Sequence, residues 1–104
     1  MAKLHRNTEI IWRVEKRREK EILEALDSGQ EADEGGTVTL IQSGMMHQLN
    51  LIGGMIWKLC DGSRDLEEVV DELSGEFDVE RSELYSDAEE FVDELVDRGW
   101  LKRD

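Results

Sequence analysis

Leu-Asn-Leu-Ile-Gly-Gly-Met-Ile-Trp-Lys-Leu-Cys-Asp-Gly, from Leu49 to Gly62, carries the local signals of a helix that follows directly on a strand. Asn50 is a residue type that caps a helix, because its side chain accepts a hydrogen bond from an amide of the first turn. Apolar residues then recur at helical spacing: Ile52, Met55, Ile56, Leu59 and Cys60. Asp61-Gly62 ends the pattern with a glycine that is free to turn left-handed. The stretch therefore predicts a strand that ends at Leu49-Asn50, a core helix and a sharp exit.

Three segments upstream of this helix have the composition of strands. Thr37–Gln42 and Met45–Leu49 are rich in β-branched or apolar residues, and Ser43-Gly44 between them suits a two-residue hairpin turn. Glu9–Glu15 is a third β-rich run. Side chains alternate along a strand, so Met45, His47 and Leu49 are expected to share one face and to cover a core. For His47 this position predicts a partly buried, hydrogen-bonded side chain.

The segment between the first and second strands has a different character. Ile22, Leu23, Ala25 and Leu26 lie at helical spacing from residue 16 onward, and Ser28-Gly29 supplies a stop. Gln30–Gly36 is polar and glycine-rich, which is typical of an exposed loop. The sequence therefore predicts an inserted helix and loop at about 16–36.

Two further helices are expected after Gly62. Asp65 and Glu68 have the spacing of a capping box, and the stripe of the helix they open is Leu66, Val69, Val70 and Leu73. The next helix spans about 81–97, with a core stripe of Leu84, Ala88, Phe91 and Leu95. One position over, Tyr85, Val92 and Val96 form a second stripe that is broken by Glu89. This second stripe either pads the core or a dimer contact, or forms the wall of a groove.

These elements predict the fold class. It is α+β and winged-helix-like, with a short three-stranded antiparallel sheet followed by a three-helix bundle. A chain of 104 residues has the size of one domain, so we expect a single domain over residues 1–104. No apolar run approaches the length that crosses a bilayer. A lone cysteine, Cys60, is typical of a reducing compartment, so we expect a buried thiol in a cytoplasmic protein.

Charge is unevenly spread along the chain and bears on its partners. Residues 1–60 hold 8 basic and 9 acidic side chains, whereas residues 61–104 hold 5 basic and 17 acidic ones. Such an acidic surface repels phosphate backbones and gains nothing from counterion release. Nucleic acid is therefore an unfavourable partner, and cationic peptides or basic protein surfaces are better electrostatic matches.

Catalysis and metal binding have no sequence support. His5 and His47 lie far apart and the single cysteine has no suitably spaced partner, so zinc-ligand spacing is missing. No phosphate-binding or dinucleotide-binding loop occurs. The many carboxylates follow the solvated faces of amphipathic helices, where a general acid has no burial to shift its pKa. We therefore expect no enzyme activity, no catalytic residue, no metal and no cofactor.

The order and spacing of these residues resemble the PqqD-like family, also called RiPP recognition elements. The matching positions are Leu49, Asn50, Ile56, Trp57, Cys60, Asp61 and Gly62, followed by Val69, Leu73, Phe77, Asp87, Phe91, Leu95 and Gly99. Upstream, Arg6-Asn7 and Ile10–Arg13 look like the family's first strand. The resemblance implies a non-catalytic chaperone that holds the leader of a ribosomally made precursor peptide for a modifying enzyme, often a radical S-adenosylmethionine protein.

The resemblance also implies a site. Family members bind the leader as an added strand on the edge of the third strand, against the third helix. In this chain the edge corresponds to Met45, Met46, His47, Gln48 and Leu49, and the helix wall to Tyr85, Glu89 and Val92. Proline at His47 is then expected to remove an edge amide. A charge at Tyr85 or Val92 is expected to lower affinity with little loss of stability.

Two other functions stay open at this point. The chain fits an accessory subunit that stabilises a modifying enzyme without any peptide site. It also fits a winged-helix regulator, although the acidic third helix argues against DNA binding. A free strand edge or the second stripe is equally suited to forming a homodimer.

Overall fold

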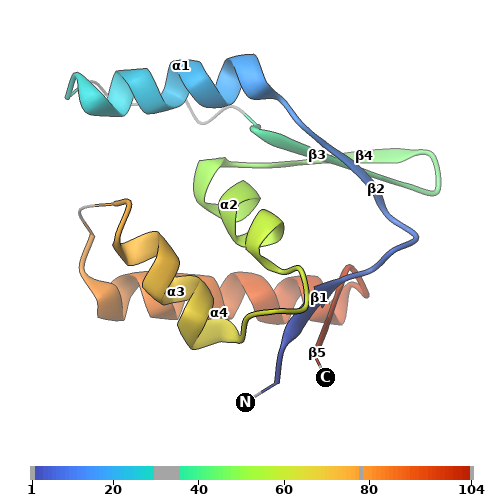
Figure 1. The fold of residues 1–104 in the computed structure, drawn as a ribbon. Helices are drawn as coiled ribbons and strands as arrows, with labels where there is room; N and C mark the ends of the chain where they lie inside the picture. The colour runs from blue at the N-terminus through green and yellow to red at the C-terminus, as the bar shows by residue number, and fades with distance from the viewer. Residues whose placement is uncertain (1, 30–35, 78, 104) are drawn as a thin grey trace. The chain divides into compact units, whose positions relative to one another are not determined.

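The computed structural model describes residues 2–29, 36–77 and 79–103, and its elements are coloured along the chain in Figure 1. It contains two compact units, Glu9–Gly54 and a second unit formed by residues up to Thr8 together with those from Met55 onward. The division falls within helix α2 (Leu51–Leu59). The single domain over residues 1–104 stays a prediction. No helix in the described ranges is long and apolar enough to cross a bilayer.

The Glu9–Gly54 unit is built on a three-stranded antiparallel sheet of β2 (Ile11–Val14), β3 (Val38–Gln42) and β4 (Met45–Leu49), in the order β2-β3-β4. Ser43 and Gly44 have φ values of 52° and 77°, so both central residues of the β3–β4 turn are left-handed. That is the geometry of a type I′ turn, whose twist matches that of a hairpin. The predicted sheet and two-residue turn are confirmed.

Strand β3 lies in the centre of this sheet and carries much of its core. Val38 and Leu40 are buried at 0% and 1% exposure, and Thr37 and Thr39 are buried as well. Leu40 lies opposite His47, and Val38 lies opposite Leu49, so His47 and Leu49 share the face of these two core residues. Met45 has the same parity but is 61% exposed, because it lies beside the turn, at the closed end of the hairpin. The expected covering role is therefore wrong for Met45.

The inserted helix is present as α1 (Lys16–Asp27), which follows β2 directly (Figure 1). Ile22 is a buried apolar residue of this helix. The Ser28 hydroxyl donates to the carbonyl of Glu24, and Gly29 has a φ of 77°, as expected for the stop. Most of the loop predicted at Gln30–Gly36 lies outside the described residues. Gly36 itself is buried rather than exposed, because it packs against the side chain of Gln48.

The start of α2 follows the sequence prediction in detail. The amide of Gly53 donates to Asn50 Oδ1 at 2.8 Å, so Asn50 caps the helix. Gly54 lies close to β3, since a Cβ built there would lie 2.6 Å from Thr37 Oγ1. Glycine at this position therefore lets the helix approach the strand closely.

The second unit contains the end of α2, then α3 (Leu66–Ser74) and α4 (Arg81–Asp97), and α3 packs against α4 (Figure 1). Gly62 ends the α2 region with a φ of 91°. Asp65 and Glu68 form the expected capping box, in which the Glu68 amide donates to Asp65 Oδ1 at 2.9 Å. The predicted helices after the sheet are confirmed, as is the α+β class.

A second small sheet was not predicted. Leu4–Arg6 forms β1, which pairs in antiparallel fashion with β5 (Leu101–Arg103). Arg6-Asn7 therefore does not continue into the Ile11–Val14 strand, as expected from the resemblance, but belongs with the end of the chain. The Asn7 amide donates to the carbonyl of Trp100 at 2.9 Å, which fixes this register. Three-residue strands carry too little alternation to be found by pattern.

Candidate functional site

The predicted site has two parts, the strand β4 and one face of α4. Strand β4 is at the edge of its sheet, with β3 on one side. A two-residue turn closes on a hydrogen-bonded pair, here Gln42 and Met45, and such pairs alternate along an antiparallel ladder. The pairs Leu40–His47 and Val38–Leu49 are then hydrogen-bonded too.

Two carbonyls of neighbouring residues face as this alternation requires, although the Thr37 amide itself turns to β4 rather than β2. The Thr37 amide donates to the carbonyl of Leu49 at 2.8 Å, so that carbonyl faces β3. The Glu15 amide donates to the carbonyl of Thr37 at 2.7 Å, so Thr37 presents its carbonyl to the β2 side. The amides and carbonyls of Met46 and Gln48 consequently point away from β3. They are the groups of β4 that an added strand can bind.

This geometry corrects the expectation for His47. Its amide belongs to the bonded pair with Leu40 and faces into the sheet. Proline at His47 therefore removes a bond within the sheet, whereas proline at Met46 or Gln48 removes an outward donor. The His47 side chain is half-buried, in agreement with its predicted environment. The direction of the His47 amide could have been predicted from the sequence, because the two-residue turn Ser43-Gly44 fixes which residues of β4 bond to β3.

One face of the sheet beside β4 has an apolar end and a polar end. Ile11, Ile41 and Met46 form a row across the three strands, and Ile11 and Met46 are 68% and 60% exposed. The next row along the strands is Arg13, Thr39 and Gln48. An added strand would therefore meet two different side-chain environments along β4.

The polar end continues onto α1 as a pocket of about 520 Å³, lined by Arg13, Glu15, Arg17, Arg18, Glu21 and Gln48. Arg13 Nε donates to Glu15 Oε1 at 2.8 Å, and the Thr39 hydroxyl donates to the same oxygen at 3.2 Å. These bonds, led by that from Arg13, hold the pKa of Glu15 below its usual value of 4.5. Glu15 is thus ionised at neutral pH, and its carboxylate already accepts hydrogen bonds from Arg13 and Thr39.

The predicted helix wall is described within its own unit. Tyr85 is half-buried and Glu89 is exposed, whereas Val92 is 0% exposed. The buried residues of α4 are Leu84, Ala88, Val92 and Leu95, and Phe91 is only half-buried. Val92 thus takes the core position that was expected for Phe91. A charged substitution at Val92 was expected to cause little loss of stability. That expectation is wrong, because the charge would be buried. The peptide contacts at Tyr85, Glu89 and Val92 stay predictions.

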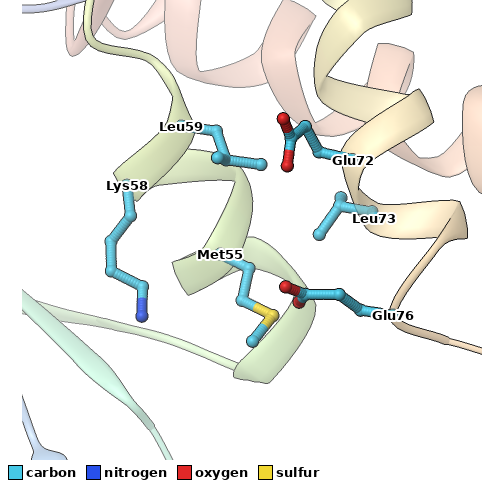
Figure 2. A pocket seen from close by; sticks show the side chains of 6 residues that line it. All are labelled: Met55, Lys58, Leu59, Glu72, Leu73 and Glu76. Atoms are coloured by element: carbon cyan, nitrogen blue, oxygen red, sulfur yellow. The ribbon is translucent and has the colours of Figure 1, made fainter.

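A smaller pocket of about 160 Å³ lies in the second unit and is lined by Met55, Lys58, Leu59, Glu72, Leu73 and Glu76 (Figure 2). Its apolar side chains come from α2 and α3, and Glu72 and Glu76 lie on the α3 side. This volume suits one side chain rather than a strand. None of the predicted site residues lines it.

The described residues contain one free cysteine and scattered His, Asp and Glu side chains. Among them, no three His, Cys, Asp or Glu side chains gather to hold a metal ion. Cys60 is buried, and burial raises the pKa of its thiol to about 12, so it is protonated at neutral pH. The sequence did not predict the role of the Arg6 side chain, whose guanidinium donates to the carbonyls of Trp57 and Lys58 at 3.1 and 2.9 Å. These bonds satisfy backbone carbonyls in the last turn of α2, which have no partner within the helix.

Comparisons with known proteins agree with these observations. The family model described as coenzyme PQQ synthesis protein D (PqqD) matches residues 20–101. A PqqA binding protein of Methylococcus capsulatus is 32% identical over 65 residues, which cover 62% of this chain and 67% of the relative. One from Rhodopseudomonas palustris strain BisB5 is 33% identical over 46 residues, which cover 44% of this chain and 45% of the relative. The chain thus matches less than half the length of this second relative.

A solved structure shows the fold over nearly the whole chain. TbiB1 in complex with the TbiA(beta) leader peptide superposes with a TM-score of 0.64, covers 94% of both chains and is 21% identical. The family model alone matches well over half of the sequence. The chain belongs to the PqqD family.

Proposed function

We propose that this chain is a non-catalytic peptide-binding protein. It takes the leader of a ribosomally made precursor peptide as an added strand on β4 and presents it to a modifying enzyme. The observation that carries the proposal is the place of β4 at the edge of its sheet, with a register from which we infer that the Met46 and Gln48 amides and carbonyls point outward. An open edge is an aggregation hazard, and a partner strand that fills it removes that hazard.

The comparisons support the same function. The relatives are named for binding PqqA, and the structural neighbour is named with a leader peptide. The modifying enzyme is proposed to be of the radical S-adenosylmethionine type, which rests on the family resemblance. A cytoplasmic location is proposed as well, since the one cysteine of the chain fits a reducing compartment.

A DNA-reading regulator is disfavoured by α4. Its exposed residues include Asp87, Glu89, Glu90, Asp93 and Glu94. A recognition helix needs donors for base edges and positive charge for phosphates, and these carboxylates offer neither. The acidic surface is better suited to a partner with basic groups.

The test is calorimetric titration with the small precursor peptide encoded nearest to this protein's gene. We expect saturable binding by the wild-type chain and a loss of about tenfold or more for Met46→Pro, which removes one outward amide and crowds the added strand. Met46→Ala keeps that amide and serves as the control, with a smaller loss. Circular dichroism verifies that both variants are folded.

Two outcomes oppose the proposal. Equal affinity of Met46→Pro and Met46→Ala places the peptide somewhere other than the β4 edge. A folded wild-type chain that binds no precursor but still forms a complex with the modifying enzyme favours the accessory subunit. Light scattering on the free chain tests the homodimer, in which a second copy occupies β4.

The helix residues need a separate comparison. Tyr85→Ala and Glu89→Lys alter side chains that have exposed surface, so we expect them to lower peptide affinity without unfolding the protein. Leu84→Ala is the control for a purely structural effect, because Leu84 is 3% exposed and its loss lowers stability. Unchanged affinity in both Tyr85→Ala and Glu89→Lys would remove α4 from the proposed site.

A further inference from the structure

The polar pocket beside β4 has a surplus of hydrogen-bond donors. Each guanidinium carries five N–H donors, whereas a carboxylate accepts at about four positions, so three arginines outnumber two glutamates in donors. Glu15 is already held by Arg13 and Thr39. Glu21 faces Arg17 at 3.5 Å, in a pair whose arginine side chain is 96% exposed. The pocket is therefore complementary to an added carboxylate.

Arg18 contributes most to this surplus. It is exposed and lines the pocket. Its charge helps to lower the pKa of Glu15, but no ion pair of Arg18 occurs among those of the described residues. Exposed ion pairs such as Arg17–Glu21 contribute little to stability, so Arg17 can turn to a new carboxylate at small cost. Two guanidiniums on adjacent residues of α1 are thus available to one acidic group.

Strand register connects this pocket to a peptide on β4. Residues directly opposite each other in a sheet place their side chains on the same face. Gln48 lines the pocket, so the peptide residue opposite Gln48 lies on the pocket's face of the sheet. The residue opposite Met46 lies on the same face, two positions away, beside the exposed row of Ile11, Ile41 and Met46.

We propose, resting on the proposed function, that the chain selects peptides with an acidic residue two positions from a large apolar residue. The acidic residue lies opposite Gln48 and pairs with Arg17 and Arg18, and the apolar residue lies opposite Met46. The spacing of two is the same for parallel and antiparallel addition, and only the order of the two residues reverses. The inserted helix α1 thereby acts as a specificity element.

The test uses a library of random peptides displayed on phage and selected against the full chain. Arg17→Glu combined with Arg18→Glu reverses the charge of the pocket. Lys16→Glu combined with Lys20→Glu makes the same charge change on exposed positions of α1 that do not line the pocket. Each double variant also removes one ion pair within α1: Arg17–Glu21 in the arginine variant and Lys20–Glu24 in the control.

We expect the wild-type chain and the lysine variant to enrich Asp or Glu two positions from an apolar residue. The arginine variant is expected to prefer Lys or Arg at that position and to bind a selected acidic peptide about tenfold more weakly. Replacing the peptide's carboxylate by its amide should weaken binding to the wild-type chain and leave binding to the arginine variant nearly unchanged.

Amide NMR spectra of the selected peptide complexes separate the two ways to fail. Peptides that shift Met46 and Gln48 but show no acidic preference, or the same preference in the arginine variant, overturn this inference and leave the proposed function standing. Peptides that leave Met46 and Gln48 unshifted, or a selection that enriches nothing, overturn both.

Discussion

Gly62, which follows α2, lies where a Cβ atom would be unfavourable for two reasons. Its φ is 91°, and a Cβ built there would lie 2.7 Å from Cε1 and Nδ1 of His5. A side chain would strain the left-handed backbone and also displace the imidazole. We expect Gly62→Ala to lower the free energy of unfolding by about 1–3 kcal/mol, measured by urea denaturation.

Gly75 provides the matched control for this substitution. It follows α3 with a φ of −76°, and a Cβ built there would have no neighbouring atom closer than 3.6 Å. Gly75→Ala should be neutral or should stabilise by about 0.4–1 kcal/mol, because alanine restricts the unfolded chain. Equal stabilities of the two variants would contradict the role assigned to Gly62.

The Cys60 thiol gives a prediction about pH. Burial raises its pKa from 9.0 to about 12, so the folded state holds this proton more tightly than the unfolded state. The resulting stability is fully present below pH 9.0 and is lost as the pH rises through about 12. We expect Cys60→Ala to flatten the fall in stability over this interval. The thiol should also react with Ellman's reagent at pH 8 only after urea is added.

Rapid reaction of the folded protein with that reagent would contradict the burial of Cys60. Denatured protein is the positive control, since its thiol has the ordinary pKa and full access to the reagent. The chain has one cysteine, so the signal reports this position alone.

Asn50 and Val92 show where single positions can be predicted from sequence. Asn50 was found because a cap depends on a few adjacent residues, and its bond to the Gly53 amide is local. Val92 was misplaced because helical spacing fixes Leu84, Ala88 and Leu95 but leaves Phe91 and Val92 on opposite flanks of that stripe. Tertiary packing decides which flank is covered.

In strand β4, amides that point toward β3 and amides that point away from it should differ in their contribution to stability. Met46→Pro removes an amide that points away from β3, whereas His47→Pro removes one that bonds to Leu40. Both substitutions impose the same restriction on φ, so their difference reports the hydrogen bond. We expect His47→Pro to lose about 1–2 kcal/mol more stability than Met46→Pro in urea denaturation. The opposite order would show that the alternation of the ladder is reversed.

The β3–β4 hairpin and the β1–β5 pair differ in how far sequence could predict them. Ser43-Gly44 is a local signal that specifies the turn, the pairing of its strands and the direction of each amide. Leu4–Arg6 and Leu101–Arg103 pair across nearly the entire sequence, with three residues each. Nothing local specifies that pairing, so only the folded chain reveals it.

The distribution of charge over the whole chain was predictable from composition, and it limits the class of partner. A formal net charge of −13 opposes association with nucleic acid and favours basic partners. The arginine pocket on α1 is a local exception to this charge. The basic run of Lys16, Arg17, Arg18 and Lys20 is visible in the sequence, but the pocket is not, because Arg13 and Gln48 reach it from different strands.

The chain and its peptide together provide the most direct test, which is amide hydrogen exchange of β4 followed by NMR, with and without the precursor peptide. In the free protein, His47 should exchange slowly because it bonds within the sheet, and Met46 and Gln48 should exchange quickly. At saturating peptide, strand addition on β4 predicts that Met46 and Gln48 become protected while His47 changes little. Fast exchange at both Met46 and Gln48 in the saturated complex would contradict strand addition at this edge.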